Sequence, residues 1–364
     1  MVNKEKVRQI IRQFRIQGDC KSFEPHGGGH INETFRVINS NPSYPDYLLQ
    51  KINHQVFKHV NQLMENMQRV LDHLLSRNKE NNGVKSLVLV PSNSKKFYFQ
   101  DSEGGFWRMF EFVEDSKVFE TISSPTIAYE GGKMFGEFLI HLSDLSPDLF
   151  YEVIPDFHNI HFRFKNLFDA EQKDTEGRVG EVQQELNFIK ERIEIMGTFQ
   201  ELNKKNLLPK RVTHNDTKLN NVLFDQNNHG LCVIDLDTVM PGFVHYDFGD
   251  AIRTCANTAP EDEPDLSKIN VSLPMFEAFA RGYLEKTKQI LTPTEIQYLP
   301  LSGAFMAFIM GVRFLTDYLM GDVYYKTNFP GQNLQRAKSQ LMLTKKIEEN
   351  YDSMHRIIQE ILED

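Results

Sequence analysis

The pattern of apolar and polar positions divides this chain into a first third of short strand-like runs and a longer, mostly helical remainder. Val7, Ile10 and Phe14 recur at helical spacing among charged residues, so the chain is expected to begin with an amphipathic surface helix. Apolar, β-prone runs then predict strands on both sides of the glycines at 27–29, and at 47–52, 86–90 and 105–113. A helix is predicted at 54–75.

Beyond this region, apolar residues recur at helical spacing in several longer stretches. Helices are predicted at residues 127–145, 182–202, 266–284, 293–319 and 333–362. The last of these is highly charged and is expected to pack on the outside. A polar stretch at 114–116 separates the two patterns. The sequence therefore predicts a two-lobed α+β fold, with a small N-terminal antiparallel-sheet lobe at 1–113 and a larger, mainly helical C-terminal lobe at 114–364.

Composition and charge narrow the class of protein. Hydrophobic residues make up 40% of the 364 residues and charged residues 25%, which is typical of a soluble globular protein. The net charge of −9 argues against nucleic acid or a membrane as the main partner. Three widely spaced cysteines (Cys20, Cys232 and Cys255) fit a reducing compartment, so a cytoplasmic location is expected. The N-terminus has no signal-peptide pattern, and no run approaches the ~20 apolar residues of a membrane span.

One short segment carries the strongest chemical signal. It reads H-x-D-x-x-x-x-N, with His214, Asp216 and Asn221 at the fixed positions, and Asp235 and Asp237 follow soon after. A kinase-like phosphoryl-transfer site needs an Asp that receives the proton of the attacking hydroxyl, and an Asn and a second Asp that hold magnesium. The alternative is that His214 and Asp216 only cap a loop, and His214 is expected to shape the loop rather than to contact substrate.

The setting of this segment supports the functional interpretation. Residues 222–224 and 231–234 predict two short strands joined by the turn-rich run 225–230. Such a hairpin would bring Asn221 and Asp235 to the same end, where both could reach one cation. The triplet Asp247-Phe248-Gly249 resembles a protein-kinase metal motif but lies too far along the chain. Asp247 is therefore interpreted as a structural residue that ties the catalytic loop in place.

Candidate nucleotide contacts come from the first third of the chain. Gly27, Gly28 and Gly29 lie between two predicted strands, where backbone N–H groups can approach phosphates, and Asn32 follows them. No G-x-x-x-x-G-K-[ST] motif is present, which argues against a P-loop NTPase.

The strand at 47–52 would normally carry a phosphate-binding lysine. Lys51 is the candidate, although alternation along the strand leaves open whether Gln50 or Lys51 faces the cleft, and Lys51 as a solvated edge charge is an equal alternative. Glu65 is either its charge partner or a surface residue. At the end of the strand at 105–113, the backbones of Glu111 and Val113 are the predicted contacts of the adenine ring.

Taken together, these motifs resemble the aminoglycoside phosphotransferase and choline kinase superfamily, whose members have a protein-kinase-like fold. Within it, the sequence is similar to the family of N-acetylhexosamine 1-kinases. The resemblance covers most of the chain, from about residue 20 to beyond residue 325. The stretches that carry it are 26–34, 211–222, 233–242, 247–250 and 311–324.

The resemblance implies transfer of the γ-phosphate of ATP to the anomeric hydroxyl of N-acetylglucosamine or N-acetylgalactosamine. It implies that Asp216 is the base, that Asn221 and Asp235 hold Mg²⁺, and that Asp237 supports the site or shares the metal. By the same likeness, His30, Arg313 and Tyr324 line the sugar site, where polar groups hold ring hydroxyls and an aromatic ring covers an apolar face.

Alternatives remain open at each level. Arg313 could instead form a buried ion pair, and Tyr324 could be a core aromatic. The protein could be another small-alcohol kinase of the superfamily, acting on choline, homoserine, methylthioribose or an aminoglycoside. A non-catalytic sugar- or nucleotide-binding protein is a third reading. The expected assembly is a monomer or a small homo-oligomer.

Overall fold

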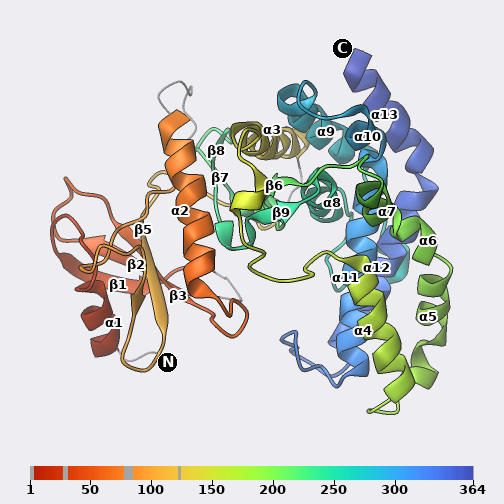
Figure 1. Cartoon of the computed structure of the whole chain (residues 1–364), viewed down its shortest axis with the longest axis horizontal. Helices are drawn as coiled ribbons and strands as arrows, with labels where there is room; N and C mark the ends of the chain where they lie inside the picture. The colour runs from red at the N-terminus through yellow and green to blue at the C-terminus, as the bar shows by residue number, and fades with distance from the viewer. Residues whose placement is uncertain (1–3, 28–31, 78–84, 122–123, 364) are drawn as a thin grey trace. The chain divides into compact units, whose positions relative to one another are not determined.

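The computed structural model describes residues 4–27, 32–77, 85–121 and 124–363, which form two compact units of the chain shown in Figure 1. Unit 1 comprises Met1–Val118, Asp148–Ile154 and Leu223–Met240. Unit 2 comprises Phe119–Pro147, Pro155–Val222 and Pro241–Asp364. The predicted single boundary between residues 113 and 114 stays a prediction.

Unit 1 is built on a five-stranded sheet whose neighbouring strands are all antiparallel. In spatial order the strands are β1 (Cys20–Pro25), β2 (Glu33–Asn39), β3 (Tyr47–Ile52), β5 (Phe106–Glu111) and β4 (Phe99–Gln100). The small antiparallel sheet was predicted, and β3 has the predicted bounds. The predicted strand at 86–90 is reduced to a single bridge between Leu89 and Phe110, although Val90 N donates to Met109 O (2.9 Å).

The two faces of this sheet carry different chemistry. Helix α1 (Lys4–Ile11) buries its apolar side on one face, against Leu49, Trp107 and Met109. Side chains alternate along a strand, and Gln50 pairs with Arg108 where Lys51 pairs with Trp107. Arg108 therefore points to the other face, where its Nη1 lies 3.8 Å from the sulfur of Met67 in helix α2 (Val60–Arg77).

Helix α2 begins later than the predicted residue 54. The side chain of Asn53 accepts a hydrogen bond from Gln55 N (3.1 Å), and Val56 N and Phe57 N both donate to Asn53 O. These contacts hold residues 53–57 in turns, because an asparagine side chain competes with the helix for backbone donors.

The predicted hairpin at 222–234 is present. Strands β7 (Val222–Phe224) and β8 (Gly230–Val233) form a two-stranded sheet. In the connecting turn, the carboxylate of Asp225 accepts hydrogen bonds from Asn227 N (2.8 Å) and His229 N (2.9 Å). Asn221 directly precedes the first strand, and Asp235 follows the second.

Unit 2 is mainly helical. Its helices are α3 (Pro125–His141), α4 (Ile160–Lys173), α5 (Gln183–Lys190), α6 (Ile193–Met196), α7 (Thr198–Lys204), α8 (Val244–Cys255), α9 (Leu273–Thr287), α10 (Pro293–Gln297), α11 (Leu299–Leu319), α12 (Gln332–Glu349) and α13 (Tyr351–Glu363). Helix α11 is the central element, packed against α12, α8, α4 and α13. Short strands β6 (Arg211–Thr213) and β9 (Met240–Gly242) form a separate two-stranded sheet.

Several of the predicted helices are divided or shorter in the structure. The predicted helix at 182–202 is divided into α5, α6 and α7, with breaks at 191–192 and Gly197. The predicted helix at 293–319 is divided at Tyr298, two residues before Pro300, which has no N–H to donate. The predicted helix at 333–362 is interrupted at Asn350, whose Nδ2 donates to Lys346 O (2.9 Å). The predicted helix at 266–284 begins only at Leu273.

The expectation that the last charged helix lies outside is wrong for its first half. Helix α12 packs along α11 and buries polar residues such as Asn333, Gln340 and Thr344. These side chains find partners inside the unit: Asn333 Nδ2 donates to Asp317 Oδ2 (2.9 Å), and the hydroxyl of Thr344 donates to Gln340 O (2.9 Å). Buried polar groups that are hydrogen-bonded in this way are tolerated in a core.

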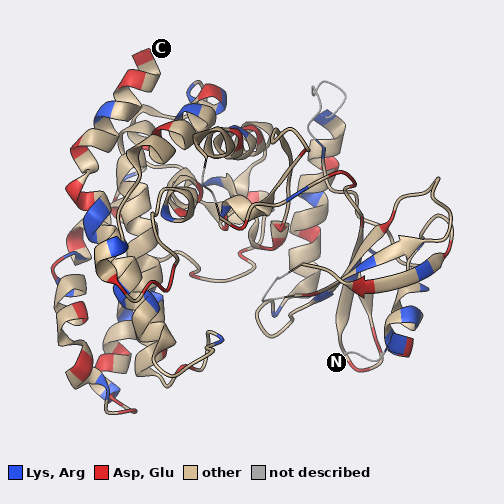
Figure 2. Cartoon of the chain, turned by 180° about the vertical axis from the view of Figure 1, so that it is seen from behind, with Lys and Arg blue, Asp and Glu red and all other residues tan. Residues whose placement is uncertain are grey.

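The expectation about membrane-spanning length also needs correction. Helix α11 is long and apolar enough to cross a membrane, although most of its apolar stretch is buried inside the structure. This burial is typical of the core helix of a globular protein. Figure 2 shows acidic and basic residues interspersed along the helices that surround it.

Helices α3 and α9 approach closely because glycines lie where they cross. A Cβ atom at Gly282 of α9 would lie 2.1 Å from Tyr129 O of α3, and one at Gly132 of α3 would lie 2.2 Å from Phe279 O. Both clashes are with backbone atoms, which cannot move aside without separating the helices.

Replacement of Gly282 by alanine is therefore expected to lower the free energy of unfolding by about 2 kcal/mol or more, as for an overpacked core. Thermal or urea unfolding measures this change. Gly180→Ala is the control, because no atom lies within 4 Å of a Cβ at that exposed position. Equal stability of the two variants would contradict the close-packing argument.

Candidate active site

The candidate catalytic loop runs from the end of β6 to the short 3-10 helix η4 (Leu219–Asn221), within unit 2. His214 and Thr217 are buried, whereas the side chain of Asp216 is about a quarter exposed (26%). Asn215 has a φ of 64°, a left-handed conformation that asparagine adopts more readily than most residues. Gly242 is needed beside the loop, because a Cβ there would lie 2.3 Å from the hydroxyl of Thr213.

A buried carboxylate on helix α8 holds this loop. Asp247 accepts hydrogen bonds from the backbone N–H groups of His214 (2.8 Å) and Asn215 (2.7 Å), and the hydroxyl of Thr217 donates to Asp247 O. Burial raises the pKa of Asp247 to about 7, against the opposing effect of the two amide donors. The structure thus confirms that Asp247 is structural and ties the loop in place.

Asp216 lies beside a cation on the same loop. Lys218 Nζ is 3.1 Å from Asp216 Oδ1. Burial by itself would raise the pKa of Asp216, but the charge of Lys218 and its hydrogen bond help to hold that pKa below the usual range. In turn, the carboxylate of Asp216 raises the pKa of Lys218. Asp216 is therefore ionised at neutral pH and able to receive a proton.

Two other residues of the motif shape the surroundings of Asp216. Asp216 N donates to His214 Nδ1 (3.3 Å), which is the loop-shaping contact expected of that histidine. Asn221 Nδ2 donates to Asp216 O (2.8 Å) and to Asp216 Oδ2 (3.2 Å). This orientation turns the amide nitrogen toward Asp216 and leaves the amide oxygen Oδ1 as the atom suited to a cation.

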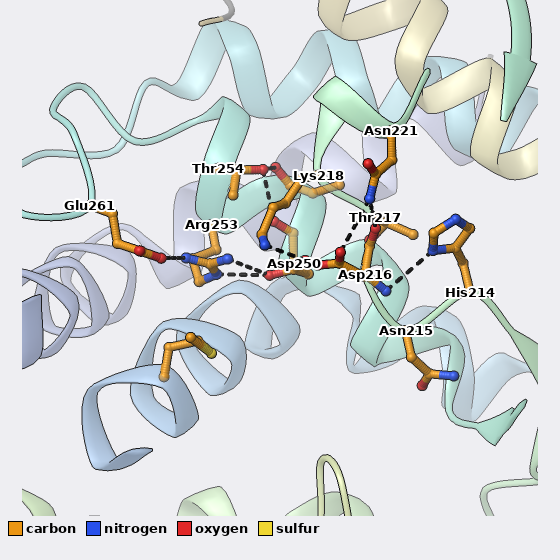
Figure 3. A network of polar contacts seen from close by, with 12 residues as sticks. His214, Asn215, Asp216, Thr217, Lys218, Asn221, Asp250, Arg253, Thr254 and Glu261 are labelled. Atoms are coloured by element: carbon orange, nitrogen blue, oxygen red, sulfur yellow. Dashed lines mark hydrogen bonds and ion pairs between the residues drawn. The ribbon is translucent and has the colours of Figure 1, made fainter. Parts of the chain in front are cut away.

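Figure 3 shows a charged network next to this loop, with Asp250 and Arg253 on α8 and Glu261 beyond its end. Arg253 Nε donates to Asp250 Oδ1 (2.8 Å) and Arg253 Nη1 donates to Glu261 Oε1 (2.8 Å). Lys218 experiences the charges of Asp250, Arg253 and Glu261 in addition to that of Asp216. Opposite charges thus alternate from the loop into the interior, and the buried Arg253 is compensated on both sides.

Asp235, the second predicted metal ligand, lies in unit 1 at the end of the hairpin. It has φ 59° and ψ 56°, a left-handed conformation that costs energy in a non-glycine residue and that is concentrated at functional sites. The carboxylate of Asp235 and the amide oxygen of Asn221 are hard oxygen donors of the kind that Mg²⁺ prefers.

Each donor, taken by itself, fits a metal that arrives with a nucleotide. In the part of the chain that the structure describes, no three His, Cys, Asp or Glu side chains gather into a metal site. Mg²⁺ bound by one or two protein ligands takes its other ligands from phosphates and water. The assignment of Asn221 and Asp235 as its protein ligands stays a prediction.

The predicted supporting residue Asp237 is buried within unit 1. Asn32 Nδ2 donates to Asp237 Oδ2 (2.8 Å), and Arg108 Nη1 pairs with Asp237 Oδ1. Asn32, predicted to contact nucleotide, is thus a partner of Asp237. Of the predicted glycine loop, Gly27 has a φ of 75°, while Gly28, Gly29 and His30 lie outside the described residues.

The other predicted nucleotide contacts have protein partners. Lys51 Nζ lies 3.5 Å from Glu33 Oε1, and it is on the face of the sheet that carries Trp107. Glu65 is exposed on α2. Glu111 N donates to Val88 O (2.9 Å), and Val113 O accepts a hydrogen bond from the hydroxyl of Ser116 (2.6 Å). The nucleotide-binding roles of Lys51, Glu111 and Val113 stay predictions.

The predicted acceptor residues lie in unit 2. The guanidinium carbon of Arg313 is 5.0 Å from the ring centre of Phe157 and 5.6 Å from that of Tyr325. Tyr324 is exposed (60%), so it is no core aromatic. The segment that carries the two tyrosines is fixed by Asp317, which accepts hydrogen bonds from the backbone N–H groups of residues 323, 324 and 325 at 2.8–3.0 Å.

Three residues near this position were missed by the sequence analysis. His158 Nε2 lies 3.1 Å from Asn215 O, and burial lowers the pKa of His158 to about 3, so its imidazole is neutral. The charges of Arg163, Arg313 and Asp216 all act on His158. The hydroxyl of Tyr325 is buried and has no hydrogen-bond partner among the described residues. No spacing or motif marks these positions, because only the folded chain gathers them.

Comparison with known proteins identifies the family. Residues 22–283 match the APH family, described as the Phosphotransferase enzyme family. The chain belongs to this family. It is therefore assigned as a phosphotransferase with a hydroxyl-bearing acceptor.

Similar folds occur in solved structures of kinases. A microcompartment-associated aminopropanol kinase has a TM-score of 0.67 at 15% identity, over 97% of this chain and 99% of that one. An aminoglycoside phosphotransferase from Alicyclobacillus acidocaldarius has a TM-score of 0.61 at 11% identity, over 97% and 96%. An amicoumacin kinase in complex with AMP-PNP and Ca²⁺ has a TM-score of 0.58 at 12% identity, over 96% and 94%. These likenesses confirm the predicted kinase-like fold.

The pairing of Asp216 with Lys218 predicts the pH dependence of the family reaction. Replacement of Lys218 by methionine removes the cation that lowers the pKa of Asp216, so the acidic limb of kcat/KM should move to higher pH. Lys218→Arg keeps the cation and should leave the limb close to its original position. Initial rates measured across acidic and neutral pH test this, and an unmoved limb in Lys218→Met would contradict the assignment of Asp216 as the base.

Proposed function

We propose that this phosphotransferase moves the γ-phosphoryl group of ATP to the anomeric hydroxyl of N-acetylglucosamine or N-acetylgalactosamine. The resemblance of five stretches of the chain to N-acetylhexosamine 1-kinases supports this choice of acceptor. The observation that carries it is a pair of arginines, Arg163 and Arg313, whose charges both act on His158, and the Nε2 of His158 lies 3.1 Å from the backbone oxygen of Asn215, the residue before the base Asp216.

The two guanidinium groups are unusual because their charges are not compensated by ion pairs. Among the described residues, neither arginine forms a salt bridge to a carboxylate. Arg163 Nη2 donates to Phe157 O (2.8 Å), and its Nε is buried without a partner. Arg313 Nη1 contacts the sulfur of Met310 (3.5 Å). Burial and the like charge of Arg313 lower the pKa of Arg163 to about 10, as expected for neighbouring cations.

This charge distribution favours one class of acceptor. Guanidinium N–H groups can donate to the hydroxyls and the acetamido oxygen of a neutral sugar, and the exposed ring of Tyr324 can cover an apolar sugar face. Choline, ethanolamine-like alcohols and aminoglycosides are cations, which two uncompensated arginines would repel. A carboxylate-bearing alcohol such as homoserine remains the alternative that also suits a pair of arginines.

The proposed chemistry uses the catalytic loop in a direct way. The ionised Asp216 accepts the proton of the anomeric hydroxyl of the sugar. The oxygen of that hydroxyl forms the new bond to the γ-phosphorus, and the bond from this phosphorus to the β–γ bridging oxygen breaks. Asn221 and Asp235 would hold Mg²⁺, which neutralises phosphate charge when it is bound. Lys218 keeps Asp216 ionised before transfer.

Product analysis with a panel of acceptors tests the proposal. Purified protein with ATP and Mg²⁺ is expected to convert acetamido sugars to sugar 1-phosphates, identified by ³¹P and ¹H NMR, and to leave choline and aminoglycosides unchanged.

Asp216→Asn should reduce kcat by about 10²–10⁴-fold with nucleotide binding retained, because it removes only the proton acceptor. Asp235→Ala should remove metal-dependent nucleotide binding. Turnover of choline, homoserine or an aminoglycoside without turnover of acetamido sugars would refute the acceptor, and unchanged turnover in Asp216→Asn would refute the base.

The arginine pair makes a separate prediction. Arg163→Met and Arg313→Met should each raise the KM for the sugar by about 10-fold or more, the equivalent of one lost charge-assisted hydrogen bond, with the KM for ATP little changed. Lys165→Met is the matched control, because Lys165 lies on the same helix as Arg163 but is 70% exposed and pairs with Asp169. An unchanged sugar KM in both arginine variants would remove the observation on which the acceptor class rests.

A further inference from the structure

Unit 1 contains a buried ion pair that the phosphoryl-transfer motifs do not explain. Arg108 on β5 pairs with Asp237, which lies 129 positions further along the chain, and the two residues are only 1% and 3% exposed. A buried charge is tolerated only when its partner and its hydrogen bonds are in place, so both side chains are held in one arrangement.

Both ends of this pair have further polar partners. Arg108 Nε donates to Gln50 Oε1 (2.9 Å) on β3, and Gln50 Nε2 donates to Thr34 Oγ1 (3.3 Å) on β2. The second oxygen of Asp237 accepts from Asn32 Nδ2 (2.8 Å), and Asn32 Oδ1 accepts from Asn53 N (3.0 Å). The contacts of Arg108 and Asp237 thus join three strands of the sheet to the segment that follows the hairpin.

Asp237 lies two residues after Asp235. It belongs to a short 3-10 helix, η5 (Leu236–Thr238), which begins directly after the left-handed backbone of Asp235. A left-handed aspartate is not the preferred conformation of an isolated chain, so the surrounding contacts must maintain it. The carboxylate of Asp237, two residues further on, is held by Arg108 and Asn32, and it restrains the direction in which Asp235 leaves β8.

The lysine expected to serve this sheet is placed differently. Lys51 lies on the opposite face from Arg108, close to Glu33, with its Nζ 5.9 Å from the ring centre of Trp107 and its side chain 32% exposed. The buried cation that contacts Gln50 on this face is therefore Arg108, which comes from β5 rather than β3.

We propose that Arg108 is a positioning residue for nucleotide and metal binding. By holding Asp237 in the described arrangement, it sets the direction of Asp235 and links Asn32, which follows the glycine run, to the same carboxylate. This inference rests on the proposed role of Asp235 as a metal ligand, but it does not depend on which acceptor is phosphorylated.

The experiment separates positioning from folding. Arg108→Met alone leaves Asp237 buried without its cation and can unfold the protein, so the variant Arg108→Met combined with Asp237→Asn is the main probe, because neither site is then charged. Thermal unfolding by circular dichroism reports the fold. Isothermal titration calorimetry with ATP, with and without Mg²⁺, reports binding. Lys58→Met, an exposed lysine in the same unit, is the control.

The expected result is a folded double variant whose Kd for ATP in the presence of Mg²⁺ rises by at least 10-fold, while its Kd without Mg²⁺ changes by less than threefold. A general loosening of unit 1 would weaken both affinities equally and would refute the positioning role. A double variant that binds ATP with wild-type affinity in the presence of Mg²⁺ would also refute the positioning role. If Lys51→Met instead lost affinity only in the presence of Mg²⁺, the positioning residue would be Lys51 and not Arg108. Failure to phosphorylate acetamido sugars, by contrast, would refute only the proposed acceptor.

Discussion

The catalytic loop depends on one buried carboxylate. Asp247 accepts hydrogen bonds from two consecutive backbone N–H groups, at His214 and Asn215, and its own carbonyl accepts from Thr217. These contacts hold a loop in which Asn215 is left-handed and in which Asp216 and Asn221 must approach each other. Helix α8 is buried along almost its whole length, so the anchor is as rigid as the core of unit 2.

Two groups of charged residues in unit 2 differ in whether their charges are paired. Around Asp216, opposite charges alternate through Lys218 and Asp250 to Arg253, so that the ionised state of Asp216 is favoured. Arg163 and Arg313, whose charges both act on His158, form no salt bridge among the described residues. The charge of Asp156 opposes that of Arg313 at Arg163. A pair of cations left uncompensated costs energy in a free protein, and it is explained if a ligand supplies the missing acceptors. In the proposed function, an ionised Asp216 is combined with an acceptor subsite that the bound sugar would complete.

Predictions from short sequence patterns were correct where the structure depends on residues close together in the chain. Strand β3 and the turn-rich hairpin after Asn221 follow from residues near each other in sequence, and both were predicted. The structural role of Asp247 was also predicted, although its contacts join residues 30–33 positions apart. Helix continuity was not predicted well, because Asn53 and Asn350 use their side chains to compete for backbone partners and Pro300 cannot donate one. Helix α12 was placed outside because its sequence is charged, yet it packs along α11, and its buried residues Asn333 and Gln340 contact Asp317 of α11 and Arg253 of α8.

The sequence by itself determined the family motif and the kinase-like division into a sheet and a helical region, since these depend on short spacings and on periodicity. It also predicted Asp216 as the proton acceptor. It left open whether Gln50 or Lys51 faces the cleft. Only the tertiary structure decided that Gln50 lies with Arg108 and that Arg108 meets Asp237, because strand register and the folding of distant segments onto one another fix which side chains meet. The gathering of Arg163 and Arg313 around His158, which contacts Asn215, has the same origin: contacts between residues far apart in sequence have no signature in any local pattern.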